Sequence, residues 1–163
     1  MQKLFGKRFI KFENNDKGMD KRKEERNMAI ENSVVFLPVK NIEETTSFYR
    51  DIVGIPVVQE QSGGICRIFD TGYGYLGFCQ YPDDRPILGG PVGACISFNC
   101  HDEADVDRQY QRILETGWPT QCMPKYMENF PVYGFFLRDP NDYKVEFQFI
   151  LLPDQQLTGG RKR

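Results

Sequence analysis

The chain has 163 residues, a mass of 19.0 kDa and a net charge of −2, and 40% of its residues are hydrophobic. This length fits one domain or two small repeated halves with a common core, and the apolar content excludes a chain that is disordered throughout. No apolar run is long enough to span a bilayer, so we expect no membrane partner. The five cysteines form no CxxC pair, which favours reduced thiols in a cytoplasmic protein over disulfides or a zinc site.

The charges are distributed unevenly along the chain. Residues 1–28 contain nine Lys or Arg and five Asp or Glu, whereas residues 30–158 contain nine Lys or Arg and eighteen Asp or Glu. An acidic body without a basic stripe disfavours nucleic acid as a partner, so we expect a small molecule or another protein. Residues 1–29 lack a sustained period and are predicted to be a disordered or dispensable extension, with a membrane-surface or partner-binding arm as the alternative; residues 153–163 are predicted to be a flexible tail.

The central part of the chain repeats one order of predicted elements. A strand, an amphipathic helix and three further strands follow one another from residue 33, and the same order returns from residue 93. In the first half the predicted elements are a strand at 33–41, a helix at 42–54 and strands at 55–62, 64–71 and 73–81. In the second half they are a strand at 93–100, a helix at 102–117 and strands at 118–127, 131–139 and 143–151.

Turn and capping residues support this division. Asn41 is a plausible N-cap before the first helix, and Gly54 and Gly117 follow the two helices. Each βαβββ half is too small to bury its own apolar face, so the two must pack together. The prediction is an α+β fold of two βαβββ units, at about 30–82 and 92–152, that form a single domain over 30–152 around a shared cleft.

Two segments resemble the vicinal oxygen chelate superfamily, which includes glyoxalase I, bleomycin-resistance proteins and extradiol dioxygenases. LPVKNIEETTSFYRDIVGIPVV resembles the opening strand–helix–strand of that family, and FFLRDPNDYKVEFQF resembles its closing hairpin, with an Asp-Pro turn before a strand that has a central Glu. The resemblance covers about residues 33–152 and implies a glyoxalase/bleomycin-resistance-type fold. It says less about the reaction, because this fold carries many chemistries.

The resemblance also implies where a metal would be held. Enzymes of the superfamily bind a divalent ion with one ligand from the first strand and one from the last strand of each unit. These positions fall at Val34, Gly77, Cys95 and Glu146, and only Glu146 is a usual ligand. We therefore expect no metal and no other cofactor.

Alternation along the strands predicts which side chains face the cleft. We assign Glu146 as the catalytic candidate, because a carboxylate in an apolar cleft can act as a general base. The alternative is a structural carboxylate paired with Arg67 or Arg138. The predicted ligand-binding residues are Phe36, Tyr75, Cys79, Cys95, Ser97, Tyr133 and Gln148. The alternative for the aromatic residues is packing where the halves meet or at a dimer contact.

Two classes of function follow. The first is a small-molecule-binding protein of bleomycin-resistance type that holds a hydrophobic or aromatic compound in the cleft, as a cytoplasmic homodimer. The alternative is a glyoxalase- or dioxygenase-like enzyme, a lyase or oxidoreductase, that uses Glu146 as base or metal ligand.

Overall fold

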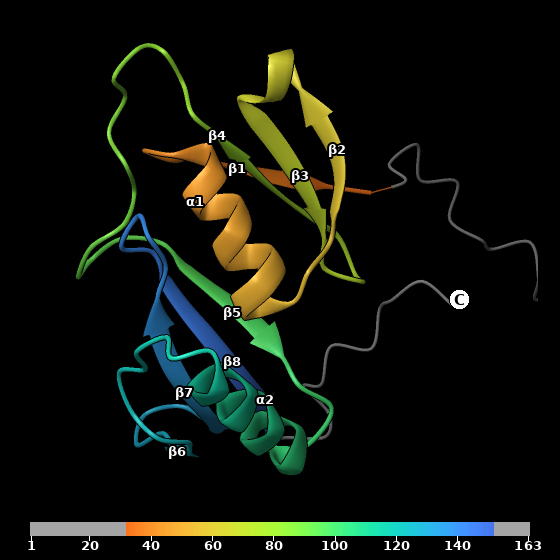
Figure 1. Cartoon of the computed structure of the whole chain (residues 1–163). Coiled ribbons are helices and arrows are strands. Elements are labelled where there is room, and N and C mark those ends of the chain that lie inside the picture. The colour runs from red at the N-terminus through yellow and green to blue at the C-terminus, as the bar shows by residue number, and fades with distance from the viewer. Residues whose placement is uncertain (1–31, 152–163) are drawn as a thin grey trace, which may run out of the picture. The chain divides into compact units, whose positions relative to one another are not determined.

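The computed structural model describes residues 32–151, and these form the two predicted repeats (Figure 1). The first comprises β1 (Val34–Pro38), α1 (Ile42–Ser47), the π-helical η1 (Phe48–Val53), β2 (Val57–Gln61), the short 3₁₀ turn η2 (Ser62–Gly64), β3 (Cys66–Asp70) and β4 (Tyr75–Cys79). The second comprises β5 (Cys95–Asn99), α2 (Glu103–Glu115), β6 (Lys125–Tyr126), β7 (Val132–Arg138) and β8 (Lys144–Ile150). Within this range no helix has the length and apolar character needed to cross a membrane. The predicted extension and tail lie outside the described residues.

Both repeats build the same four-stranded sheet. The strand orders are β1-β4-β3-β2 and β5-β8-β7-β6. In each sheet the first strand of the repeat runs parallel to the last, and the other pairs are antiparallel. One helix packs on one face of each sheet, α1 on the first and α2 on the second (Figure 1). The predicted α+β fold of two βαβββ units is confirmed.

The predicted helix ends are confirmed in detail. The Asn41 side chain accepts hydrogen bonds from the backbone N–H groups of Glu43 and Glu44, which satisfies donors that the first helical turn leaves free. Gly54 ends the first helix with a φ of 89°, a conformation that costs glycine little. These local signals set where each helix begins and ends.

The third predicted strand of the second repeat is much shorter than expected. Only Lys125–Tyr126 forms a strand within the expected 118–127. Pro119 and Pro124 have no backbone N–H to donate to a neighbouring strand, which explains the loss of regular pairing. Because β6 is so short, the segment that follows it does not extend the edge of the second sheet.

The core joins both repeats around buried aromatic rings. Tyr49 is fully buried and stacks on Phe78, with 4.2 Å between ring centroids. Phe135 stacks on Phe147 at 5.4 Å in the second repeat. The buried cluster extends without a break from one sheet to the other, so neither repeat has a core of its own.

A buried turn between β7 and β8 locks the two repeats together. Asp139 accepts hydrogen bonds from the Tyr49 hydroxyl at 3.1 Å and from the backbone N–H groups of Asn141 and Tyr143, each at 2.8 Å. The Asn141 amide donates to the Thr45 hydroxyl at 2.9 Å. Burial raises the pKa of the Asp139 carboxyl, and the donors around it oppose that rise. The Asp-Pro turn therefore positions the second sheet against the first helix.

The prediction that all cysteines are reduced thiols is wrong for one pair. Cys66 and Cys79 form a disulfide between β3 and β4, and Cys95, Cys100 and Cys122 are free. The pairing follows from register, because Cys66 lies directly opposite Cys79 in the antiparallel ladder, with 4.1 Å between their Cα atoms. The sequence spacing of 13 residues carries no such signal.

Replacing Tyr49 by Phe is expected to destabilise the fold by about 1–3 kcal/mol near neutral pH, because Asp139 loses a donor. Without this donor the pKa of Asp139 rises further above that of the unfolded chain. The extra destabilisation of the variant is therefore fully present at pH values above the pKa of Asp139 in the folded protein. It disappears as the pH falls toward about 3.9, where the carboxyl becomes protonated and no longer carries a buried charge. Urea unfolding across this pH range measures the effect. Tyr110→Phe is the control, since the Tyr110 hydroxyl makes no hydrogen bond among residues 32–151; an equal, pH-independent loss in both variants would contradict the role of the turn.

Alkylation of the unfolded, non-reduced protein tests the disulfide. We expect three of the five cysteines to react before reduction, and Cys66 and Cys79 to react only after it. Peptide mass spectrometry identifies the protected pair. Full alkylation before reduction would show that the two thiols are not bonded in the purified protein.

Candidate functional site: a pocket on the second sheet

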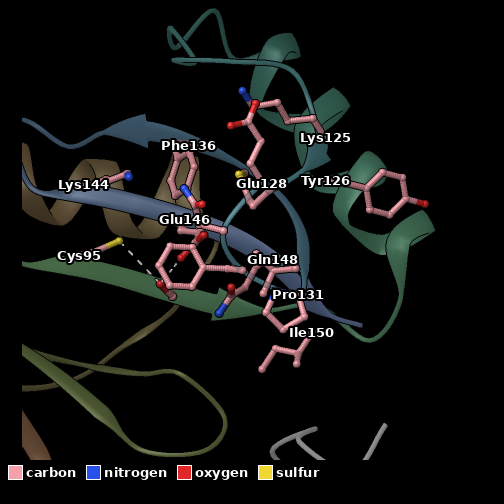
Figure 2. A pocket seen from close by; sticks show the side chains of 15 residues that line it. Cys95, Lys125, Tyr126, Glu128, Pro131, Phe136, Lys144, Glu146, Gln148 and Ile150 are labelled. Atoms are coloured by element: carbon pink, nitrogen blue, oxygen red, sulfur yellow. Dashed lines mark hydrogen bonds between the residues drawn. The ribbon is translucent and has the colours of Figure 1, made fainter. Parts of the chain in front are cut away.

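A cavity of about 800 Å³ lies on the face of the second sheet that is opposite α2 (Figure 2). Its floor comes from β5, β7 and β8, and its rim comes from β6 and the segment that follows β6. The lining residues are Cys95, Ser97, Lys125, Tyr126, Met127, Glu128, Asn129, Phe130, Pro131, Val132, Phe136, Lys144, Glu146, Gln148 and Ile150. Apolar and aromatic side chains alternate in this lining with polar and charged ones, a mixture that a small-molecule site can use for both burial and orientation of a ligand.

Glu146 lies at the centre of the floor and is held by Ser97. The Ser97 hydroxyl donates to Oε2 of Glu146 at 2.5 Å, across the parallel pairing of β5 and β8 (Figure 2). The alternative in which Glu146 pairs with Arg67 or Arg138 is wrong. Arg67 pairs with Glu43 and Glu60, and Arg138 donates to backbone carbonyls and lies 3.5 Å from Asp142. The carboxylate therefore faces the cavity without a basic partner from the described chain.

Cys95 is poorly suited to act as a nucleophile. Its sulfur lies 3.7 Å from the Ser97 hydroxyl, and no histidine lines the cavity. Burial raises the pKa of the Cys95 thiol, and the nearby negative charge of Glu146 raises it as well. A thiol with a raised pKa contains little thiolate near neutral pH, so Cys95 serves as a polarisable wall residue.

The structure brings half of the sequence-predicted residues together. Cys95, Ser97, Glu146 and Gln148 line the cavity, as alternation along β5 and β8 predicts. Phe36 and Tyr75 lie on the first sheet and do not line it. Whether the lining residues bind a ligand stays a prediction.

Two further predicted residues are placed elsewhere, each for a clear reason. Cys79 is 2% exposed and bonded to Cys66, so it cannot line an open pocket. Tyr133 lies on the helix face of β7, in phase with Phe135, and its hydroxyl donates to Asp107 of α2 at 2.9 Å. The period of two along β7 is the signal that separates Tyr133 from Phe136, which lies on the cavity face.

Sequence reasoning missed the rim of the cavity. The sequence predicts a strand end within residues 125–131, and no pattern in this segment predicts that it covers the second sheet. Phe136 and Lys144 could be found from alternation alone, because they share a face with Glu146 across β7 and β8. The rim depends on how a loop folds back, which periodicity does not encode.

The residues present do not fit the metal centre that the resemblance implies. In the first sheet Phe36 lies opposite Gly77, and a Cβ added to Gly77 would come within 2.4 Å of the Phe36 ring. The aromatic ring thus fills the space that a ligand side chain at position 77 would need. In the second sheet the corresponding pair is Ser97 and Glu146, which supplies one carboxylate. The first-strand positions expected from the resemblance, Val34 and Cys95, lie opposite Tyr75 and Lys144 instead. The described residues do include one grouping of possible ligands, His101, Asp102 and Asp105, but it does not line this cavity.

The comparisons with known proteins agree with the fold and the repeat. The model of the Glyoxalase/Bleomycin resistance protein/Dioxygenase superfamily matches residues 32–147, and the chain belongs to this family. Among curated proteins, none matches the sequence at a significant level.

Solved structures of the family share the fold at low sequence identity. Lactoylglutathione lyase from Agrobacterium tumefaciens is 22% identical with a TM-score of 0.58, over 76% of this chain and 95% of that chain. A glyoxalase/bleomycin resistance protein/dioxygenase family enzyme from Burkholderia phytofirmans PsJN is 18% identical with a TM-score of 0.61, over 73% and 98%. TioX from Micromonospora sp. ML1 is 18% identical with a TM-score of 0.59, over 74% and 98%. At these identities the likeness concerns the fold alone.

Proposed function

We propose that this protein binds a small hydrophobic or aromatic compound in the cavity on its second sheet, without the metal centre of the family's enzymes. The observation that carries the proposal is the cavity itself, about 800 Å³ in volume, with aromatic side chains in its walls and, on its floor, a carboxylate that forms no ion pair with any of residues 32–151. Its size lies within the range of ligand pockets, and an aromatic guest would bury apolar area against Phe136 and the rim. The protein is further proposed to act in the cytoplasm; the three free thiols support this location, whereas the Cys66–Cys79 disulfide is of a kind that is rare in the reducing cytosol.

The second candidate function is a lyase or oxidoreductase reaction with Glu146 as base or metal ligand. It is favoured by the position of Glu146, which is held by Ser97 and faces the cavity. Against it stands the donor set, since Phe36 fills the space beside Gly77. One divalent ion per chain in the purified protein, lost in Glu146→Gln, would favour the enzyme over the binding protein.

Thermal unfolding in the presence of planar compounds tests the proposed function. A guest at a hundredfold excess over its dissociation constant should stabilise the fold by about 2.7 kcal/mol. Glu146→Gln should weaken the binding of cationic guests and leave neutral ones nearly unchanged, whereas Phe136→Ala should weaken both. Glu44→Gln, an exposed carboxylate of the first repeat, is the control. Equal loss of both guest classes in Glu146→Gln would remove the charge role, and absence of any stabilising compound would contradict the binding function.

We also propose that two copies associate. The support is apolar exposure on the edge strands of the first sheet, where Val35 and Phe36 of β1 remain 58% and 42% exposed and Val58 of β2 remains 51% exposed. Light scattering during size-exclusion chromatography should give twice the mass of the chain, and Phe36→Ser should shift it toward the monomer. Val92→Ser, which alters a fully exposed apolar residue elsewhere, should leave the mass unchanged. A monomer at every concentration would contradict association.

A further inference from the structure

Two opposite charges lie side by side on the cavity floor without forming an ion pair. Lys144 and Glu146 are two residues apart on β8, so their side chains leave the same face of the strand about 7 Å apart. Both side chains are long enough to meet across this distance. Neither takes part in an ion pair within the part of the chain that the structure describes.

Each charge is instead held by a different neighbour. The Lys144 ammonium lies 3.7 Å from the centroid of the Phe136 ring, which holds it by a cation–π interaction (Figure 2). The Glu146 carboxylate accepts the hydrogen bond from Ser97 at 2.5 Å. The Phe136 ring and the Ser97 hydroxyl therefore hold the ammonium and carboxylate groups separately, and both charged groups remain at the cavity. A guest with only one charged group would desolvate the other charge without compensation.

The rim of the cavity also carries one positive and one negative side chain. Lys125 and Glu128 also line the cavity, and within residues 32–151 they too form no ion pair. The cavity therefore has two positive and two negative side chains among apolar walls, a balanced arrangement that favours neither a purely cationic nor a purely anionic guest.

We propose that the ligand of this pocket is an aromatic zwitterion, whose ammonium group binds Glu146 and whose carboxylate binds Lys144. This inference rests on the proposed binding function and adds the chemical class of the guest. The ring of the guest meets the apolar lining, and its two charged groups occupy the gap between Lys144 and Glu146. Both contacts are charge-assisted, which makes them stronger than hydrogen bonds between neutral groups.

Matched indole compounds separate the contributions of the two charges. Calorimetric or thermal-shift titration would compare L-tryptophan, tryptamine, indole-3-propionate and 3-methylindole. These compounds share the indole ring and are, in this order, a zwitterion, a cation, an anion and a neutral molecule. The corresponding phenyl compounds repeat the test on a second ring. We expect the zwitterion to bind about tenfold more tightly than the cation or the anion, and the neutral compound to bind most weakly.

Single substitutions should remove one preference at a time. Glu146→Gln should reduce the affinity for the zwitterion to that for the anion, and Lys144→Met should reduce it to that for the cation. Lys144→Arg should retain tight binding, because it keeps the charge. Glu44→Gln and Lys40→Met remove the same charges from the exposed surface of the first repeat and should change nothing. The unfolding temperature without ligand verifies that each variant folds.

The outcomes distinguish this inference from the proposed function. If 3-methylindole binds as tightly as tryptophan, or if Glu146→Gln and Lys144→Met leave the order of affinities unchanged, the zwitterion class is wrong while the pocket still binds aromatic compounds. If no compound of either ring series binds at millimolar concentration, both the inference and the proposed binding function are contradicted.

Discussion

The structure depends on one buried carboxylate. Asp139 stands at the turn between β7 and β8, and its donors come from that turn and from Tyr49 of the first helix. A buried charge without these donors would cost several kcal/mol, which is a large share of the stability of a small domain (about 5–15 kcal/mol). The turn therefore settles how β8 lies against the first repeat. Because β8 carries Lys144, Glu146 and Gln148, the same constraint determines the geometry of the cavity floor.

The two repeats share a backbone and differ in chemistry. At corresponding places of the two sheets, Phe36 lies opposite Gly77 and Ser97 lies opposite Glu146. The first pair closes its sheet face with an aromatic ring and a glycine, and the second keeps a carboxylate at an open cavity. In this chain the polar site is therefore confined to the second sheet, although the fold can hold a metal between its repeats. This asymmetry is the reason that binding, rather than metal chemistry, is the function proposed for this member of the family.

The fold followed from the sequence because its signals are local. Asn41 caps the first helix, and strict alternation along β5 and β8 predicts that Ser97 and Glu146 both face the cleft. The disulfide could not be predicted in this way, because it depends on the register that places Cys66 opposite Cys79. The rim of the cavity around Phe130 could not be predicted for a similar reason. Packing, and not the hydrophobic period of the sequence, determines how a loop folds back over a sheet. Tyr133 is in phase with Phe135 along β7, and this period of two places it on the helix face, where its hydroxyl reaches Asp107.

The proposed binding floor lies on the second sheet alone. The most direct measurement is a titration of isotope-labelled protein with tryptophan, followed by backbone amide chemical shifts in NMR spectra. We expect concentration-dependent shifts along β5 and β8 and in residues 125–132, with their largest values around Ser97 and Glu146. Shifts confined to β1 and β4, with β5 and β8 unaffected, would contradict it.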